Sequence, residues 1–372
     1  MPQPIRVLWL IKGLDLGGAE RLLVSVAKLA DHEKFRYSAA YVLPSRVGAV
    51  SDLEAAGVTT YCLGTDHHLD LRWARQLRRL LRTQKFDILH THLPYVQPVG
   101  ALVAHTLPRA ERPHLVYTQH NIWHGTRWPS RLANRFTLGL NEAIIAVSNA
   151  AREGTPRAVR ARTEVVVHGV SLDEAQAAKP FREEVRAELG VGDDEVLVTS
   201  VANFRPEKGH SLLLAAAQRV INQGLPVRFA IVGHGPLENE IRSLHAQLEL
   251  GDRVKLLGLR RDVFRILSAS DVYVLSSLHE GFPVSIMEAL VMGLPVVSTA
   301  VGGVLEALRD GVEGMVVPPG RADLLGDTIA RVVRDSDLRK RLTDGAKKRS
   351  DAFDVTVAVR QMEKLYGELV SR

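Results

Sequence analysis

The sequence predicts an α/β protein of two doubly wound domains, each a parallel sheet with helices on both faces. Three observations predict this fold class. Short β-branched or apolar runs alternate with segments of helical periodicity along the whole chain. The length of 372 residues fits two domains of average size. Apolar residues at 46% and charged residues at 24% give the balance of a globular protein.

The expected strands are short runs rich in Val, Ile and other strand-forming residues. In the first half they are Arg6–Ile11, Tyr37–Val42, Thr59–Cys62, Ile88–His90, Leu115–Thr118, Ala143–Ala146 and Glu164–Val167. In the second half they are Val196–Val201, Val227–Val232, Val254–Leu257, Val272–Leu275, Val296–Ser298 and Gly314–Val317. Amphipathic helices are expected between them, among them Gly18–Ala30, Leu69–Thr83, Leu212–Gln223, Leu237–Leu248 and Val284–Met292.

The joint between the halves is expected at Ser171–Pro180, which is polar, rich in alanine and ends in proline. We therefore expect an N-terminal domain at 1–175, a C-terminal domain at 176–353 and a final helix at 354–372 that packs back toward the first domain. Open α/β sheets bind ligands at the carboxyl ends of their strands. The functional motifs should follow strands, beside a cleft between the halves.

The single cysteine, Cys62, excludes an internal disulfide and favours a reducing, cytoplasmic location. The opening run Ile5–Ile11 is short and lacks a basic lead-in, so no secretory signal is expected. No run of eighteen uninterrupted apolar residues occurs, which argues against a membrane span.

The excess positive charge lies in the first half of the chain. Residues 1–178 carry 22 Lys and Arg against 15 Asp and Glu, whereas residues 179–372 carry 26 against 27. An anionic membrane surface or a phosphorylated acceptor would explain this excess, and solubility alone is the alternative. The basic segment 69–83 contains an indole and can lie on an anionic bilayer, at the inner face of the plasma membrane. Alternatively, it packs its leucines on the sheet. No nucleic-acid partner is expected.

Glycine-rich turns follow two of the expected strands. Gly17-Gly18-Ala19-Glu20 opens a helix after the first strand, where backbone N–H groups can approach an anion. Its spacing is not G-x-G-x-x-G, which argues against a dinucleotide cofactor. A second turn, Gly233-His-Gly235, can abut a phosphate or a nucleoside. Each turn is also consistent with a tight connection that binds no ligand.

Arg205 and Lys208 lie three residues apart on the loop after Val196–Val201. Arg chelates phosphate oxygens in a planar fork, and Lys adds a point charge. The pair suits the stabilisation of a departing diphosphate, whose negative charge grows as the bond to it breaks. A solvated basic loop that ends in Gly209 is the alternative.

The most informative segment runs from Glu280 to Glu288, between a buried strand and a largely apolar helix. Gly281 and Pro283 fix the turn that carries Glu280. Glu288 lies just over one turn into the helix, where an unpaired carboxylate is costly to bury. Vicinal hydroxyls of a sugar or ribose suit both carboxylates, and the helix N-terminus near Val284 offers N–H groups to phosphate.

Four histidines, His90, His92, His120 and His124, follow neighbouring strands. Alternate residues of a strand point the same way, so His90 and His92 can converge. No carboxylate or cysteine completes a metal-binding set. We therefore expect histidines that line a cleft or core, and no bound metal.

Together these motifs resemble the family-4 retaining glycosyltransferases of GT-B fold, over nearly the whole chain. Gly17-Gly18-Ala19-Glu20, Arg205 with Lys208, Glu280-x7-Glu288, Gly293-Leu-Pro-Val-Val and Gly302-Gly303 carry the resemblance. It implies two Rossmann-like domains facing across a cleft. It also implies a metal-independent hexosyltransferase that moves a sugar from a UDP- or GDP-sugar to a carbohydrate or lipid-linked acceptor, in the synthesis of cell-envelope polysaccharide or glycolipid.

The resemblance also implies roles for single residues. Arg205 and Lys208 hold the donor diphosphate, Glu280 contacts the donor sugar, and Glu288 binds the ribose hydroxyls. His120 lies beside the transferred sugar. Gly18, Gly233 and the backbone of Gly281, Phe282, Pro283 and Val284 are the other donor-side candidates, and Gly17, Glu20 and His92 are the acceptor-side candidates.

Two positions depart from the family. Many members carry Arg five residues before the Lys, where this chain has Asn203, so Arg205 must supply the fork from a shifted position. The segment before the joint often reads Asn-Gly-Val, whereas this chain has His168-Gly169-Val170, and no contact is assigned to His168. The family's mechanism is same-face substitution, in which the departing phosphate helps to deprotonate the acceptor and catalysis is electrostatic and positional.

Two other functions are compatible with the sequence. A nucleotide-sugar epimerase of the same fold would arrange its acidic and histidine residues differently. A non-catalytic sugar-nucleotide-binding protein would tolerate loss of Arg205, Lys208 or Glu280, and all three are present. The sequence leaves the sugar, the base and the acceptor open.

Overall fold

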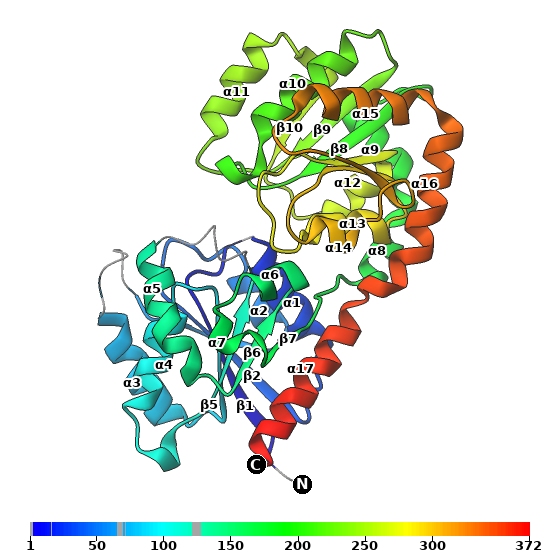
Figure 1. Cartoon of the computed structure of the whole chain (residues 1–372). Coiled ribbons are helices and arrows are strands. Elements are labelled where there is room, and N and C mark those ends of the chain that lie inside the picture. The colour runs from blue at the N-terminus through cyan, green and yellow to red at the C-terminus, as the bar shows by residue number, and fades with distance from the viewer. Residues whose placement is uncertain (1–2, 16, 65–69, 71, 121–127) are drawn as a thin grey trace. The chain divides into compact units, whose positions relative to one another are not determined.

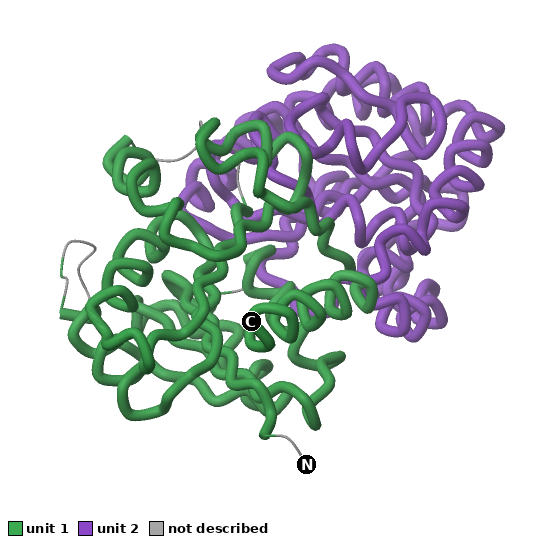
Figure 2. The backbone as a smooth tube through the Cα atoms, turned by 60° about the horizontal axis from the view of Figure 1, so that its bottom comes forward, with its two compact units in different colours: residues 1–169, 355–372 green, residues 170–354 purple. Residues whose placement is uncertain are grey.

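A computed structural model describes residues 3–15, 17–64, 70, 72–120 and 128–372. The chain divides into two compact units (Figure 2). Unit 1 comprises residues 1–169 with 355–372, and unit 2 comprises residues 170–354. Each unit contains one parallel sheet and its own buried apolar clusters. The predicted fold class, two doubly wound α/β domains, is therefore confirmed.

Unit 1 contains a seven-stranded sheet in the order β3-β2-β1-β4-β5-β6-β7, and every pairing is parallel (Figure 1). The strand order reverses between β1 and β4, which makes the carboxyl ends of these strands the expected ligand site. The strands are β1 (Ile5–Ile11), β2 (Phe35–Tyr41), β3 (Thr59–Cys62), β4 (Ile88–His92), β5 (His114–Gln119), β6 (Ala143–Ala146) and β7 (Thr163–Val165).

Helices cover both faces of this sheet. One face packs against α1 and α17, around Trp9 and Tyr37, and the other packs against α3 and α4, around Trp73. The final helix contributes Tyr366 to the first of these cores. The helices are α1 (Gly18–Leu29), α2 (Val50–Ala55), α3 (Arg72–Gln84), α4 (Gln97–His105), α5 (Trp128–Thr137), α6 (Asn149–Glu153), α7 (Arg157–Arg160) and α17 (Val355–Val370).

Unit 2 contains a six-stranded parallel sheet in the order β10-β9-β8-β11-β12-β13, which reverses between β8 and β11. Its strands are β8 (Val196–Val201), β9 (Val227–Val232), β10 (Val254–Gly258), β11 (Val272–Leu275), β12 (Val296–Thr299) and β13 (Gly314–Val317). Its helices are α8 (Leu172–Ala178), α9 (Arg182–Leu189), α10 (His210–Ile221), α11 (Glu238–Gln247), α12 (Val263–Ala269), α13 (Val284–Val291), α14 (Val304–Ala307), α15 (Ala322–Arg334) and α16 (Ser336–Arg349).

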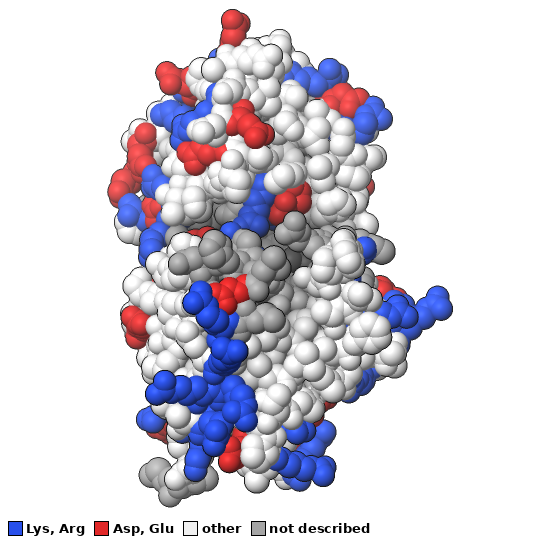
Figure 3. All heavy atoms as spheres, turned by 90° about the vertical axis from the view of Figure 1, so that its left-hand side faces the viewer, with Lys and Arg blue, Asp and Glu red and all other residues white. Residues whose placement is uncertain are grey.

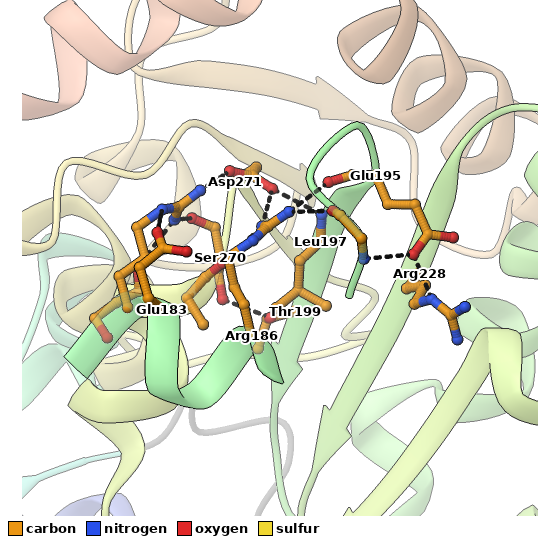
Figure 4. A network of polar contacts seen from close by, with 12 residues as sticks. Glu183, Arg186, Glu195, Leu197, Thr199, Arg228, Ser270 and Asp271 are labelled. Atoms are coloured by element: carbon orange, nitrogen blue, oxygen red, sulfur yellow. Dashed lines mark hydrogen bonds and ion pairs between the residues drawn. The ribbon is translucent and has the colours of Figure 1, made fainter. Parts of the chain in front are cut away.

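A polar network joins α9 to the amino ends of β8 and β11 (Figure 4). Asp271 accepts hydrogen bonds from Arg182 Nη2 at 2.6 Å, Arg186 Nη1 at 3.0 Å and the backbone N–H of Leu197 at 2.8 Å. Arg186 is buried and also donates to backbone carbonyls. This network lies at the opposite end of the strands from the predicted site, so its role is to hold the sheet together.

Every strand that the sequence predicts is present, with ends that differ by at most two residues. The strand β4 continues to His92, because His92 pairs with Thr118 of β5. The predicted helix at 69–83 is α3, whose apolar residues Trp73, Leu77 and Leu81 are buried; Leu69 lies outside the described residues. In the described part of the chain, no helix combines the length and the apolar character needed to cross a bilayer.

Candidate active site

The carboxyl ends of β8 and β11, at the point where the strand order of unit 2 reverses, bring two predicted motifs together. The loop after β11 contacts the loop after β8, because Leu278 N–H donates to the carbonyl of Glu207 at 2.8 Å. Ser276 Oγ donates to the carbonyl of Lys208 at 2.9 Å. Gly209 has φ +63°, and a Cβ there would lie 2.3 Å from the carbonyl oxygen of Ser276. Only glycine permits this close contact.

At the centre of this contact lies an ion pair between Lys208 and Glu280. Lys208 Nζ lies 2.6 Å from Glu280 Oε1, and Ser277 Oγ donates to the same oxygen at 2.6 Å. Glu280 is 8% exposed, so this oxygen is satisfied by short, charge-assisted contacts. Glu280 Oε2 has no hydrogen-bond partner within the described residues, which leaves it able to accept from a ligand hydroxyl.

Arg205 precedes the 3-10 turn Pro206–Lys208 and is brought next to Lys208 by that turn. The backbone N–H of Lys208 donates to the carbonyl of Arg205 at 3.0 Å. The Arg205 side chain is half-buried, and it forms no ion pair with any described residue. The two predicted cations therefore share one turn, while only Lys208 contacts the Glu280 carboxylate.

The turn Gly233-His234-Gly235 packs directly on the loop after β8. Phe204 N–H donates to the carbonyl of His234 at 2.9 Å. A Cβ at Gly233 would lie 2.0 Å from the carbonyl oxygen of Ala202, and one at Gly235 would lie 2.6 Å from that of Phe204. Close packing alone accounts for both glycines, and the nucleotide contact assigned to Gly233 stays a prediction.

The helix α13 starts after Pro283, its N-cap, and is almost entirely buried. Glu288 is 3% exposed on this helix, and it is engaged with other residues. Burial, with a smaller contribution from the charge of Glu288, raises the pKa of the Tyr273 phenol. The preceding turn is fixed at Gly281, whose carbonyl accepts from Gly303 N–H at 3.1 Å. Phe282 and Val284 are each half-buried beside it.

In unit 1, Gly17 is the N-cap of α1 and Gly18 is its exposed first residue. A Cβ at Gly17 would lie 2.4 Å from Oε2 of Glu20, so the glycine makes room for this side chain. A carboxylate in the first turn of a helix is stabilised by the helix dipole. Glu20 thus has a structural reason to be where it is, and its acceptor-side role stays a prediction.

Four imidazoles form a continuous column at the carboxyl end of the unit 1 sheet. His90 lies at one end, where its ring centroid is 4.1 Å from that of His92. His92 Nδ1 lies 3.0 Å from His120 Nε2, and the ring of His168 stacks on that of His120 at 5.5 Å. At the other side of His90, Nδ1 lies 2.6 Å from the hydroxyl of Tyr366 and Nε2 lies 2.7 Å from Thr118 Oγ1.

Burial lowers the pKa of every imidazole in this column, and for His90, His92 and His120 the neighbouring histidines lower it further. The pKa of His168 falls to about 4. All four rings are therefore neutral at physiological pH. Across the described residues, no three His, Cys, Asp or Glu side chains are arranged to hold a metal ion. The fourth sequence candidate, His124, lies outside the described residues.

Sequence reasoning missed three contributors to these sites. Ser277 contacts Glu280, and its only sequence signal is its position two residues after a buried strand. His168 joins the histidine column although the sequence assigned it no contact, and Tyr366 reaches the column from the far end of the chain. No local pattern reveals the contacts of His168 and Tyr366, which join residues far apart in sequence.

Comparisons with known proteins agree with this description. Residues 16–174 match the family model described as Glycosyltransferase Family 4, and residues 181–349 match the one described as Glycosyl transferases group 1. A similar Escherichia coli protein is UDP-Gal:alpha-D-GlcNAc-diphosphoundecaprenol alpha-1,3-galactosyltransferase, 26% identical over 372 residues and covering 95% of each chain. The N-acetyl-alpha-D-glucosaminyl L-malate synthase of Bacillus anthracis is 25% identical over 81% of this chain and 80% of its own.

Among solved structures, that of Anabaena HepE in complex with UDP and glucose superposes with a TM-score of 0.83. The match covers 98% of this chain and 100% of the HepE chain, at 23% sequence identity. This similarity is one of fold.

Proposed function

Because the chain belongs to the family-4 glycosyltransferases, which have the GT-B fold, we propose that it is a retaining hexosyltransferase that uses a UDP- or GDP-sugar. We further propose that the sugar is transferred to a hydroxyl of a carbohydrate or lipid-linked acceptor, in the synthesis of polysaccharide or glycolipid. The E. coli relative has a name that specifies a UDP-sugar donor and a diphosphoundecaprenol-linked acceptor, which supports both parts.

The observation that carries the donor proposal is the contact of Lys208 with Glu280 where the unit 2 sheet reverses its strand order. Lys208 and Arg205 are the cations for the donor diphosphate, and Glu280 Oε2 accepts from a hydroxyl of the donor sugar. Glu288, on the next helix, accepts from the ribose hydroxyls. A binding site in which one cation contacts a carboxylate and a second cation lies on the same turn suits a sugar joined to a diphosphate.

The same residues suit same-face substitution. As the bond between sugar and phosphate breaks, negative charge develops on the diphosphate, and the fixed cations stabilise it most in the transition state. The departing phosphate then accepts the proton of the acceptor hydroxyl. In this proposal Arg205 and Lys208 supply the positive charge that a divalent cation supplies elsewhere, and the reaction requires no metal.

The donor proposal is tested with purified protein and a set of UDP- and GDP-hexoses. We expect slow release of the nucleoside diphosphate from one donor, faster release with an acceptor, and no loss of rate in EDTA. NMR of the product should show that the anomeric configuration of the donor is kept. An inverted product would overturn the retaining mechanism, and a complete lack of hydrolysis or transfer would favour a non-catalytic binding protein.

For the acceptor, we propose that unit 1 contacts an anionic membrane surface. Figure 3 shows Lys and Arg side chains gathered on the side of unit 1 that carries α3. Arg75, Arg78, Arg79 and Arg82 are exposed there, with Glu111 as the acidic residue among them. Because Trp73, Leu77 and Leu81 are buried, α3 offers only electrostatic attraction, about 1 kcal/mol per basic residue near an anionic leaflet.

The helix α5 adds apolar side chains that α3 does not. Trp128, Leu132 and Phe136 repeat every four residues and are 69%, 50% and 73% exposed. Aromatic residues of this kind settle at the headgroup level of a bilayer. The helix α4 contacts both α3 and α5, so the basic and the apolar helix flank the same helix of unit 1.

Co-sedimentation with vesicles tests the membrane proposal. We expect binding to vesicles that contain phosphatidylglycerol and none to phosphatidylcholine vesicles. Arg75→Ser/Arg79→Ser should weaken binding and its salt dependence, and Phe136→Ser should weaken it without changing the salt dependence. The double change Arg331→Ser/Lys340→Ser on unit 2 is the matched control. Equal binding by all variants, or none by the unaltered chain, would exclude this surface.

A further inference from the structure

The histidine column contains one hydrogen bond whose direction the surroundings determine. His92 Nδ1 and His120 Nε2 lie 3.0 Å apart, so one of the two nitrogens carries the proton and the other accepts it. Both rings are neutral, and a neutral imidazole carries only one proton. The choice between the two nitrogens therefore fixes the tautomer of both residues at once.

The environment of His92 decides whether the shared proton lies on His92 Nδ1 or on His120 Nε2. Its other nitrogen, Nε2, is buried and has no hydrogen-bond partner among the described residues, and the residue is 3% exposed. If Nε2 carried the proton, a buried N–H would have no acceptor. If Nδ1 carries it, only a lone pair is left unpaired, which native structures tolerate more often than an unpaired N–H. His92 therefore donates from Nδ1, and His120 accepts at Nε2.

His90 and Tyr366 hold His92 in this position. Trp9, which is a donor only, hydrogen-bonds the Tyr366 hydroxyl, and this hydroxyl lies 2.6 Å from His90 Nδ1. His90 Nε2 lies 2.7 Å from Thr118 Oγ1, so both nitrogens of the His90 ring are held by hydrogen bonds. The His90 ring packs against that of His92, with the two centroids 4.1 Å apart.

We propose that His92 is a positioning residue that fixes His120 as the Nδ1–H tautomer, so that His120 presents one neutral hydrogen-bond donor to the sugar substrate. Within the described residues, Nδ1 of His120 has no hydrogen-bond partner, and His120 is the most exposed ring of the column. A neutral N–H group orients a sugar oxygen, whereas an imidazole lone pair would act as a base. The contact of His120 with a sugar rests on the proposed function and on the role that the family resemblance implies for His120, but the tautomer does not.

The tautomers are measured directly by long-range 1H–15N correlation NMR on protein labelled with 15N in the histidine rings. The His120 and His92 signals are assigned from their loss in His120→Gln and His92→Asn. We expect a proton on Nδ1 and none on Nε2 for both residues at pH 7.5. A proton on His120 Nε2 would overturn the proposal, whatever the enzyme's activity. If the tautomers are as expected but no nucleotide-sugar reacts, the proposed function fails and the tautomer assignment stands.

Variants of His92 test the consequence for catalysis. The amide nitrogen of Asn occupies the place of Nδ1, so His92→Asn keeps the donor, whereas His92→Phe keeps the ring volume and loses the donor. We expect His92→Phe to lower kcat/KM about tenfold, the value of one hydrogen bond, and His92→Asn to recover most of this loss. His105→Phe changes a half-buried histidine on α4 that lies outside the column, and it is the control for replacing a histidine by phenylalanine. Equal activity in His92→Asn and His92→Phe at equal melting temperature would mean that the hydrogen bond positions nothing.

Discussion

Lys208 and Glu280 form an ion pair in which the carboxylate is nearly inaccessible and the ammonium group is partly exposed. Nζ lies 2.6 Å from Oε1, and the side chains are 23% and 7% exposed, respectively. The residue proposed for the diphosphate and the residue proposed for the sugar thus neutralise each other. Replacing Lys208 alone removes the proposed catalytic cation and also leaves a buried negative charge, so the loss of activity must be separated from the loss of stability.

The first prediction concerns Lys208→Ala. We expect kcat to fall by about two orders of magnitude or more, as when one group that stabilises transition-state charge is removed. The free energy of unfolding should fall by about 1–3 kcal/mol, because Glu280 loses its charged partner. Steady-state kinetics and denaturant unfolding measure the two effects.

A double variant separates the two effects. In Lys208→Ala/Glu280→Gln the buried charge is gone, so stability should recover while kcat stays low. Lys340→Ala is the matched control, because its ion pair with Asp344 is 76% exposed at the lysine and should affect neither quantity. Near-normal transfer by Lys208→Ala would remove our account of the leaving group.

The second prediction concerns Gly209, which allows the loop after β8 to touch the end of β11. Gly209→Ala should lower both kcat/KM and the melting temperature, because its Cβ would lie 2.3 Å from the Ser276 carbonyl and would displace Lys208. Gly224→Ala is the control: its φ is +69°, but no atom lies within 4 Å of the added Cβ. Both variants place an alanine in the left-handed region, so only the difference between their activities measures the effect of displacing the loop. Equal activities of the two variants would refute the proposed effect on Lys208.

The parts of the molecule that the sequence predicts are those with a local cause. Strands such as Val272–Leu275 are buried on both faces and read as unbroken apolar runs, so their bounds agree with the structure. The Glu280–Glu288 segment is readable because Gly281 and Pro283 mark a turn between a buried strand and a helix. The Lys208–Glu280 contact joins residues 72 positions apart and depends on which strands are neighbours. The sequence indicates two motifs there, but not the contact between them.

His168 is a second residue whose contact could not be predicted from the sequence. The family pattern has Asn at this position, and the departure gave no reason to expect a functional contact. Only the fold places this residue against His120, because β5 and β7 end at the same edge of one parallel sheet. A single histidine in a sequence does not reveal that it will stack at the end of a row of three others.

The third prediction concerns Asp271, which binds two arginines and a backbone N–H at the amino ends of the strands in Figure 4. Asp271→Asn leaves the buried Arg186 without its charge partner and should lower the free energy of unfolding by about 3 kcal/mol or more. Because the network lies away from the candidate site, kcat of the folded fraction should be unchanged.

The control is Asp327→Asn, which breaks an exposed ion pair with Arg219 and should lower the free energy of unfolding by at most about 1 kcal/mol. A large loss of kcat in Asp271→Asn would show that the two ends of the sheet are coupled.

The fourth prediction concerns stability at acidic pH. Burial lowers the pKa of His168 from 6.5 to about 4, so between these values the unfolded chain binds a proton that the folded chain excludes. The stabilisation is complete above pH 6.5 and is lost as the pH falls toward 4, by up to about 1.4 kcal/mol per pH unit for this residue. His90, His92 and His120 act in the same direction, because their pKa values are also lowered. We therefore expect the free energy of unfolding, measured by denaturant titration, to fall steeply from pH 6.5 to pH 4.5.

The variant His168→Asn tests the contribution of His168 and introduces the residue that the family often carries. It should reduce the dependence of the unfolding free energy on pH by an amount that corresponds to at most one bound proton. An unchanged dependence on pH would mean that His168 is protonated in the folded protein, and would contradict the conclusion that all four imidazoles of the column are neutral.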